Sequence, residues 1–174
     1  MVLVIATEAM LFAYLLFGYF YLASSATGPW PPSGRPSLSL ALPNTGILLA
    51  SSVCIWWAER GIRAGSARRL VVGLVATLAL GLTFVSIQAV EYSRESFRLS
   101  TNAYSSVFYT VTGLHGAHVL VGLLMVAVTL IRTLKGHFSA ERHLAVTNTA
   151  MYWHFVDAVW LVVFVSLYAS PYFT

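Results

Sequence analysis

The sequence predicts an all-α, polytopic membrane protein, a bundle of five transmembrane helices. First, 58% of its 174 residues are hydrophobic and only 9% are charged, whereas a water-soluble domain has roughly 25% charged residues. Second, the apolar residues form five runs, each near the ~20 residues that a helix needs to cross a bilayer. Third, the net charge of +4 comes from basic residues in short loops, a pattern that favours membrane orientation over nucleic-acid binding.

The first helix is expected at about residues 1–24 and ends at the polar residues 24–28. Four prolines follow within residues 29–36, and they remove backbone donors and favour extended conformations. The apolar run starts at Met1 itself, with no basic leader or cleavage pattern of a signal peptide. We therefore expect that the native start lies upstream or that an N-terminal part is absent from this sequence.

The other four helices, expected within a single membrane domain spanning 1–174, cover about residues 40–58, 69–91, 104–132 and 144–170. Pro43 falls in the first turn of the second helix, where a missing N–H does no harm. Pro171 stops the fifth helix because proline cannot continue the hydrogen-bond ladder.

Lysine and arginine are distributed unequally between the loops. The loops after the second and fourth helices hold seven of them, which are Arg60, Arg63, Arg68, Arg69, Arg132, Lys135 and Arg142. The loops after the first and third helices hold three, which are Arg35, Arg94 and Arg98. Because loops rich in these residues stay in the cytoplasm, we expect the N-terminus inside and the C-terminus outside.

Several polar side chains lie within the apolar runs, where an ionisable group is costly and needs a reason. They are Glu8 in the first helix, Gln88 and Glu91 in the third, His115 and His118 in the fourth, and His154 and Asp157 in the fifth. Each pair is spaced i,i+3, so that both members share one helix face. We expect the pairs of the fourth and fifth helices to meet across their interface, helped by small Gly113, Gly116 and Ala117.

Three interpretations of these polar residues remain open. Three imidazoles and the Asp157 carboxylate suit a metal ion. Di-iron bundles, however, use several glutamates, and the only other carboxylate available here is that of distant Glu8. A proton or ion path is the second interpretation, since intramembrane His and carboxylates are its usual material. The third, which we favour, is that these groups hydrogen-bond helices to one another or to lipid headgroups.

Specific strings occur in order along nearly the whole chain. They are TEAMLF at 7–12, WPP at 30–32, LPNTGILLASS at 42–52, QAVEY at 88–92, TGLHGAHV at 112–119 and YWHFVDAVW at 152–160. Together these strings resemble cytochrome c oxidase subunit III, of the haem-copper oxidase subunit 3 family. That subunit commonly has seven helices, and this chain resembles the last five, as in the shortened forms of several bacterial oxidases.

The resemblance implies a non-catalytic subunit of an aerobic respiratory terminal oxidase that couples O2 reduction to proton pumping. It implies no catalytic residue, haem, copper or other metal on this chain, with haem and copper in partner subunits and phospholipids in a cleft. The expected partners are oxidase subunit I as the main contact, subunit II in the same complex, and a respiratory supercomplex. No nucleic-acid partner is expected. The expected location is the bacterial cytoplasmic membrane, and the expected electron donor is cytochrome c.

The resemblance also assigns roles to individual residues. Glu8 matches a reactive intramembrane carboxylate, and the lipid-binding residues match His118, Arg132 and Phe17, although Phe17 replaces a common tryptophan. The residues expected to be structural are His115, His154, Asp157, Gln88 and Glu91. Independently of the resemblance, Arg132 at the cytoplasmic end of its helix suits a phosphate, because a guanidinium pairs bidentately with phosphate oxygens.

Other functions remain as alternatives. Close ones are subunit III of a quinol oxidase and the accessory subunit of a nitric oxide reductase, since other subunits choose the electron donor. Of a different class are a stand-alone proton or ion carrier that uses Glu8 and the His/Asp face, and a membrane metalloenzyme.

Overall fold

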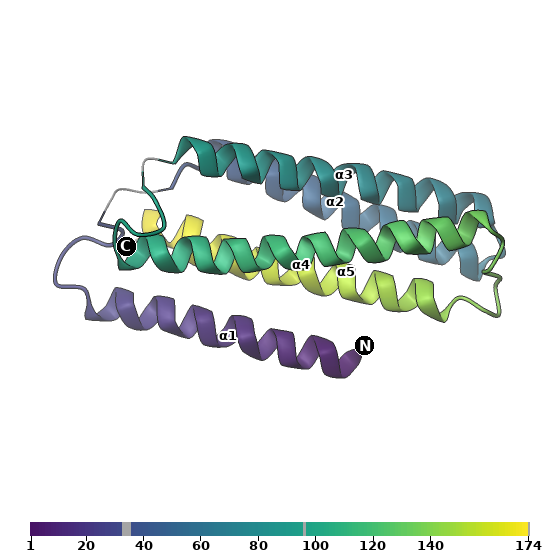
Figure 1. Ribbon diagram of the computed structural model, residues 1–174, viewed down its shortest axis with the longest axis horizontal. Helices are drawn as coiled ribbons and strands as arrows, with labels where there is room; N and C mark the ends of the chain where they lie inside the picture. The colour runs from purple at the N-terminus through teal and green to yellow at the C-terminus, as the bar shows by residue number, and fades with distance from the viewer. Residues whose placement is uncertain (33–35, 96, 174) are drawn as a thin grey trace.

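The computed structural model describes residues 1–32, 36–95 and 97–173, and long helices dominate it (Figure 1). The helices are α1 (Val2–Ser25), α2 (Leu38–Arg63), α3 (Ala67–Arg94), α4 (Ala103–Leu134) and α5 (Leu144–Val163). All five spans are long and apolar enough to cross a membrane, and the described residues include no strand. The predicted all-helical membrane fold is therefore confirmed. Arg35, which the charge count uses, lies outside the described residues.

The helix ends follow local chemistry more closely than hydropathy. α2 continues to Arg63, beyond the predicted end near residue 58, because Arg63 pairs with Glu59 one turn earlier at 2.6 Å. Arg60 adds a cation–π contact, with its guanidinium 4.0 Å from the Trp56 ring centroid. The chain then reverses at Gly65, whose φ of +77° favours glycine.

The sequence predicts one helix over residues 144–170, but the fifth span is not uniform. It is α-helical to Val163, a π-helix over Phe164–Ala169 and a short 3-10 helix over Ser170–Tyr172. Pro171 has no N–H for the carbonyl of Leu167 four residues earlier, and its ring crowds that carbonyl. The Leu167 oxygen instead accepts a hydrogen bond from the Tyr104 hydroxyl at 3.3 Å.

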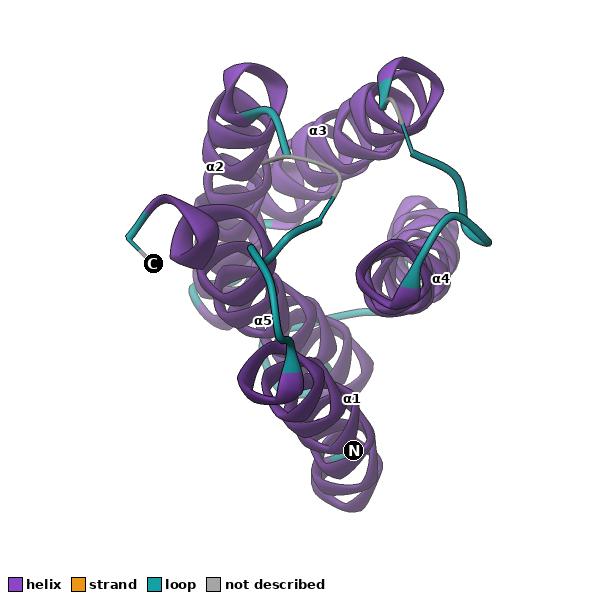
Figure 2. Ribbon diagram, turned by 90° about the vertical axis from the view of Figure 1, so that its left-hand side faces the viewer, coloured by secondary structure: helices purple, strands orange, loops and turns teal. Residues whose placement is uncertain are grey.

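The helices form a bundle in which they are buried to different extents (Figure 2). α2 packs most extensively on α3, while α5 lies against α2 and α4. α1 packs mainly on α4 and α5 at the edge of the bundle. In its most apolar 18-residue stretch only 11% of the residues are buried, against 56% for the fifth span. One face of α1 is therefore free for lipid or protein.

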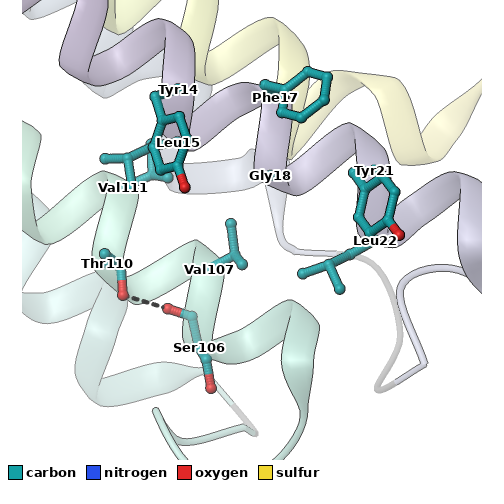
Figure 3. Close-up of a pocket in the computed structure, with 10 residues that line it drawn as sticks. All are labelled: Tyr14, Leu15, Phe17, Gly18, Tyr21, Leu22, Ser106, Val107, Thr110 and Val111. Atoms are coloured by element: carbon teal, nitrogen blue, oxygen red, sulfur yellow. Dashed lines mark hydrogen bonds between the residues drawn. The ribbon is translucent and has the colours of Figure 1, made fainter.

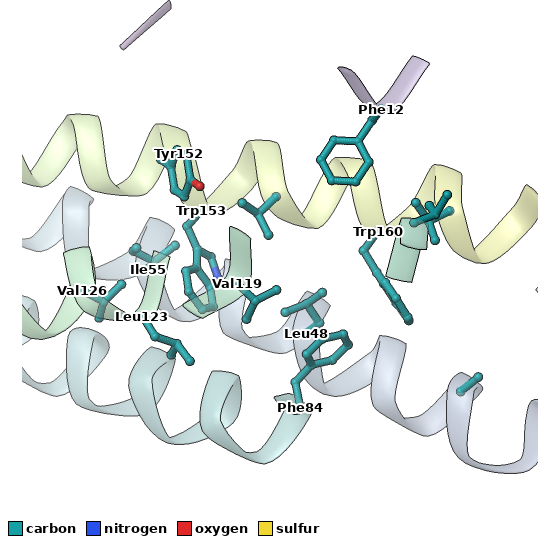
Figure 4. Close-up of a cluster of buried hydrophobic side chains, with 14 of the residues drawn as sticks. Phe12, Leu48, Ile55, Phe84, Val119, Leu123, Val126, Tyr152, Trp153 and Trp160 are labelled. Carbon is teal, nitrogen blue, oxygen red and sulfur yellow. The ribbon is translucent and has the colours of Figure 1, made fainter. Parts of the chain in front are cut away.

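Most of the core lies between α2, α3, α4 and α5, and Phe12, Leu16 and Tyr19 of α1 pack against it at one edge. Figure 4 shows Trp153 and Trp160 projecting from α5 towards side chains of the neighbouring helices. Trp153 fits because two glycines face it: a Cβ on Gly81 would lie 2.7 Å from its ring, and one on Gly122 would lie 2.9 Å away. These glycines let the helices approach closely, as small residues do at transmembrane interfaces.

The predicted role of Gly113 and Gly116 at the α4/α5 interface is wrong. A Cβ on either glycine would have nothing within 4 Å. Both residues instead line a groove between α3 and α4, together with Ala117. Sequence spacing identified small residues on α4 correctly but assigned close packing to the wrong ones, since Gly122 makes the contact with α5.

Candidate functional site

The most distinctive polar contact within the membrane joins α1 to α4. Glu8 Oε2 lies 2.9 Å from His118 Nε2, and His118 Nδ1 lies 2.8 Å from the Leu114 carbonyl oxygen. Phe12 packs edge-on against the imidazole, with ring centroids 5.1 Å apart. The Glu8 and His118 side chains are 31% and 13% exposed. Glu8, which the sequence analysis treats as distant from the histidines, therefore contacts one directly.

The hydrogen bonds of His118 constrain how it can bond Glu8. Because a carbonyl oxygen only accepts, the Nδ1–H of His118 must donate to Leu114. The contact between Nε2 and the Glu8 carboxyl needs a proton on one of the two atoms, which either a neutral pair or an imidazolium–carboxylate pair supplies. Both arrangements have no net charge, which lowers the cost of placing ionisable groups at membrane depth.

Two apolar grooves flank α1. One of about 390 Å³ lies beside the Glu8–His118 pair and is also lined by Val4, Met125 and Tyr152. The other, of about 350 Å³, lies further along α1. Both grooves have mainly apolar walls that suit acyl chains, and the first has an ionisable pair in its wall.

Figure 3 shows the second groove, where Tyr14, Phe17 and Tyr21 project from α1 and Val107 and Thr110 from α4. Phe17 is 68% exposed and stacks on Tyr21, with ring centroids 6.4 Å apart. The Thr110 hydroxyl donates to the Ser106 carbonyl of its own helix and so presents little free polarity to the groove. Phe17, predicted to bind lipid, is thus placed on a groove wall.

The predicted meeting of the α4 and α5 polar pairs is wrong. His118 turns to α1, whereas His154 and Asp157 turn to α2 and bond Ser52. His154 Nδ1 lies 3.0 Å from the Ser52 Oγ, and the Ser52 hydroxyl donates to Asp157 Oδ2. The cause is angular, because equal depth on antiparallel helices does not decide which face each residue presents.

Further hydrogen bonds hold α2 to its neighbours inside the core. They run from Trp153 Nε1 to Ser51 Oγ (2.9 Å), from Trp160 Nε1 to Thr45 Oγ1 (2.9 Å) and from Asn44 Nδ2 to the Phe84 carbonyl (3.2 Å). The sequence analysis missed the part that α2 plays. A signal existed, because Asn44, Thr45, Ser51 and Ser52 recur seven residues apart and so share one helix face.

The remaining polar residues predicted to be structural are buried. His115 is 1% exposed, and its ring lies 4.8 Å from that of Trp160 and 6.0 Å from that of Phe84. Neither ring nitrogen has a hydrogen-bond partner among the described residues. Gln88 donates to the Tyr168 hydroxyl at 3.3 Å, and Glu91 is buried beside both. These contacts fit helix bracing near one end of the bundle.

Arg132 lies in the last turn of α4, at the end that the charge distribution predicts to be cytoplasmic. Its guanidinium carbon is 5.1 Å from the centroid of the Phe138 ring. A shallow hollow of about 480 Å³ beside it is also lined by His137, Glu141 and Arg142. Two guanidinium groups in one hollow suit an anion such as phosphate.

Within residues 1–32, 36–95 and 97–173, no three His, Cys, Asp or Glu side chains come together in a way that suits a metal ion. The histidines are instead divided between separate environments. His118 pairs with a carboxyl of α1, His154 bonds a hydroxyl of α2, and His115 lies among aromatic rings.

Comparison with known proteins agrees with the strings in the sequence. A family model described as cytochrome c oxidase subunit III matches residues 1–172. Proteins named cytochrome c oxidase subunit 3 from Coturnix japonica and Gallus gallus are each 38% identical to this chain over 175 residues. The protein of that name from Sus scrofa is 40% identical. Each alignment covers 97% of this chain and 67% of the relative.

These matches confirm the resemblance predicted from the sequence, and they extend through all five membrane-spanning helices. They make the protein a multi-pass membrane subunit of an oxidase complex. The chain belongs to the cytochrome c oxidase subunit III family.

Proposed function

We propose that this chain is the non-catalytic subunit III of an aerobic haem-copper terminal oxidase that couples O2 reduction to proton pumping. It packs on the haem-bearing subunit I, with subunit II in the same complex, and binds phospholipids in its grooves. The observation that carries the proposal is the family match over residues 1–172, which includes every membrane-spanning helix.

Affinity purification of the tagged chain from its native membrane tests this proposal. We expect a haem-bearing subunit in a 1:1 ratio, recognised by its visible absorption spectrum, and O2 consumption by the purified complex. Recovery of the chain without any haem-bearing subunit, in a detergent that preserves other respiratory complexes, would contradict it.

The Glu8–His118 pair and the grooves beside α1 support a lipid-binding and protective role. A pair with no net charge braces α1 against α4, while the grooves offer apolar walls to acyl chains. The hollow at Arg132 has the cationic groups that a phosphate headgroup needs. Bound lipid and the braced α1 then keep the adjacent catalytic subunit active over many turnovers.

We propose cytochrome c as the electron donor, in keeping with the names of the relatives. A quinol oxidase subunit III and a nitric oxide reductase subunit are the alternatives, because the donor binds other subunits. Assays of the purified complex with reduced cytochrome c and with quinol distinguish them. Oxidation of quinol alone would reject the proposed donor.

A proton or ion carrier is a second candidate, favoured by the single proton that Glu8 and His118 share. The purified chain alone in liposomes decides between the two. We expect no proton flux above that of empty liposomes. A flux that disappears in Glu8→Gln would support the carrier and reject the accessory role.

For the membrane, we propose the bacterial cytoplasmic membrane with the N-terminus inside. The basic residues at the end of α2 and the start of α3, and those around the α4–α5 connection, support this orientation. A reporter fused at the C-terminus that is active only outside the cytoplasm tests the orientation.

A further inference from the structure

The hydrogen bonds around Ser52 determine what His154 offers to its surroundings. Ser52 has one hydroxyl proton, and it donates this proton to Asp157 Oδ2. Its oxygen can therefore only accept from His154 Nδ1, which lies 3.0 Å away and must carry a proton. In a neutral imidazole the other nitrogen then has a lone pair. His154 Nε2 is therefore a hydrogen-bond acceptor.

This acceptor has no partner in the chain as described, since no residue in 1–32, 36–95 or 97–173 bonds Nε2. Asp157 is 4% exposed, whereas His154 is only half-buried. His154 lies ten residues after Leu144, about 15 Å into the helix and so near the middle of a ~30 Å hydrocarbon layer. Lipid tails offer no donor at that depth, and headgroups lie too far away.

The surface around His154 suits a helix. We call it the α2/α5 seam, and its residues are Leu49, Ser52 and Trp56 on α2 and Met151, His154 and Ala158 on α5. Each set follows helical spacing, so that it forms one stripe along its helix. α2 and α5 lie side by side in Figure 2. Leu49, Trp56, Met151 and Ala158 are exposed, while Ser52 and His154 are half-buried. Ala158, one turn after His154, is exposed and small enough to let another backbone approach.

We propose that the α2/α5 seam docks a transmembrane helix of a partner subunit, and that a donor side chain on that helix bonds His154 Nε2. The proposal rests on the proposed function and names the surface by which the chain joins its complex. The exposed face of α1 differs from the seam, because its ionisable residue, Glu8, is satisfied within the chain by His118. A partner helix can supply the donor that His154 needs in mid-membrane, so we assign the seam to protein and the face of α1 to lipid.

A photoreactive benzophenone amino acid at Ala158 tests the docking surface in the intact complex. After irradiation, we expect a covalent product between this chain and a partner subunit. Leu124 on α4, which is 65% exposed, is the control position. Only lipid adducts at position 158 would overturn the proposal. If the complex co-purifies but only position 124 crosslinks to protein, the docking inference fails while the proposed function stands. If no partner co-purifies, both fail.

Two substitutions test the hydrogen bond itself. His154→Leu removes the acceptor, and we expect the subunit to dissociate roughly 3- to 20-fold more readily, the range for one hydrogen bond between transmembrane helices. His154→Gln keeps an acceptor and retains most of the binding. Thr83→Val, at an exposed α3 hydroxyl bonded to its own helix, leaves association unchanged. Equal association of His154→Leu and the wild type overturns the proposal. Rescue by Gln separates lost docking from lost folding.

Discussion

α1 and α2 are membrane-spanning helices of similar length, 24 and 26 residues, but the molecule uses them differently. In the most apolar stretch of α2, 33% of the residues are buried, and its polar side chains bond α3 and α5. In α1 the buried share is 11%, and Glu8 makes its single side-chain hydrogen bond to another helix among the described residues. α2 belongs to the braced core, whereas α1 is an attached helix with one face free.

This difference teaches how buried polar groups divide their roles within one membrane protein. In the α2–α5 core they bond backbone and side-chain partners and hold helices at fixed rotations. At α1, the Glu8–His118 pair holds the helix against α4 while leaving grooves on its flanks. Changes in the core should therefore lower stability, whereas changes on α1 should alter lipid content and working lifetime.

The largest expected effect is that of Trp153→Ala in the core. Trp153 is fully buried and donates to Ser51, so its removal leaves a cavity and removes the hydrogen bond between α5 and the Ser51 hydroxyl, which then keeps only its bond to the Leu48 carbonyl. We expect a loss of about 3–5 kcal/mol in the free energy of unfolding, measured by denaturation in detergent micelles. Trp57→Ala, at a Trp that is 41% exposed on α2, is the matched control. Similar losses in both variants would break the distinction between core and surface.

Glycine substitutions sharpen the same comparison with a smaller effect. A Cβ on Gly73 would lie 2.5 Å from the Ala58 Cβ and 2.8 Å from the Cys54 carbonyl oxygen, so Gly73→Ala should separate α2 from α3. We expect a loss of about 1–3 kcal/mol. Gly18→Ala on α1 meets nothing within 4 Å and should be neutral. Thermal unfolding of both variants checks this, and a neutral Gly73→Ala would contradict the packing of α2 on α3.

Glu8→Ala should change function more than stability. We expect initial O2 consumption near that of the wild type and a shorter working lifetime, because α1 loses its bond to His118. Glu8→Gln, whose amide can bond His118 but does not ionise, separates bracing from proton chemistry. Recording O2 consumption until the activity decays gives both quantities. A wild-type lifetime in Glu8→Ala would remove the protective role from this pair.

The smallest effect on stability is expected for Phe17→Ala on the free face of α1. Surface substitutions of this kind change the free energy of unfolding by about 0.5 kcal/mol or less. The groove wall is lost, however, so fewer phospholipids should stay bound after a detergent wash, as counted by mass spectrometry. Phe20→Ala, which alters an exposed ring outside the groove lining, should keep its lipids.

The sequence predicts the number, order and approximate bounds of the helices because hydropathy and loop chemistry are local. It also predicts which polar residues lie at membrane depth. It does not predict their partners, since helix rotation depends on packing of the whole bundle: His118 turns to α1, and His154 turns to α2. Pro171 predicts a stop, but not the π-helix before it, in which Leu167 accepts a hydrogen bond from Tyr104 of another helix.

Native mass spectrometry of the tagged chain, released gently from its membrane, tests the central claim most directly. The account predicts one mass that contains this chain, a haem-bearing subunit and bound phospholipids. Harsher activation should remove lipid before it removes the protein partner, because the lipid proposed for the α1 grooves meets apolar walls, whereas the partner proposed for the seam also makes a hydrogen bond to His154. A mass of the chain alone, without a haem-bearing partner, would contradict the account.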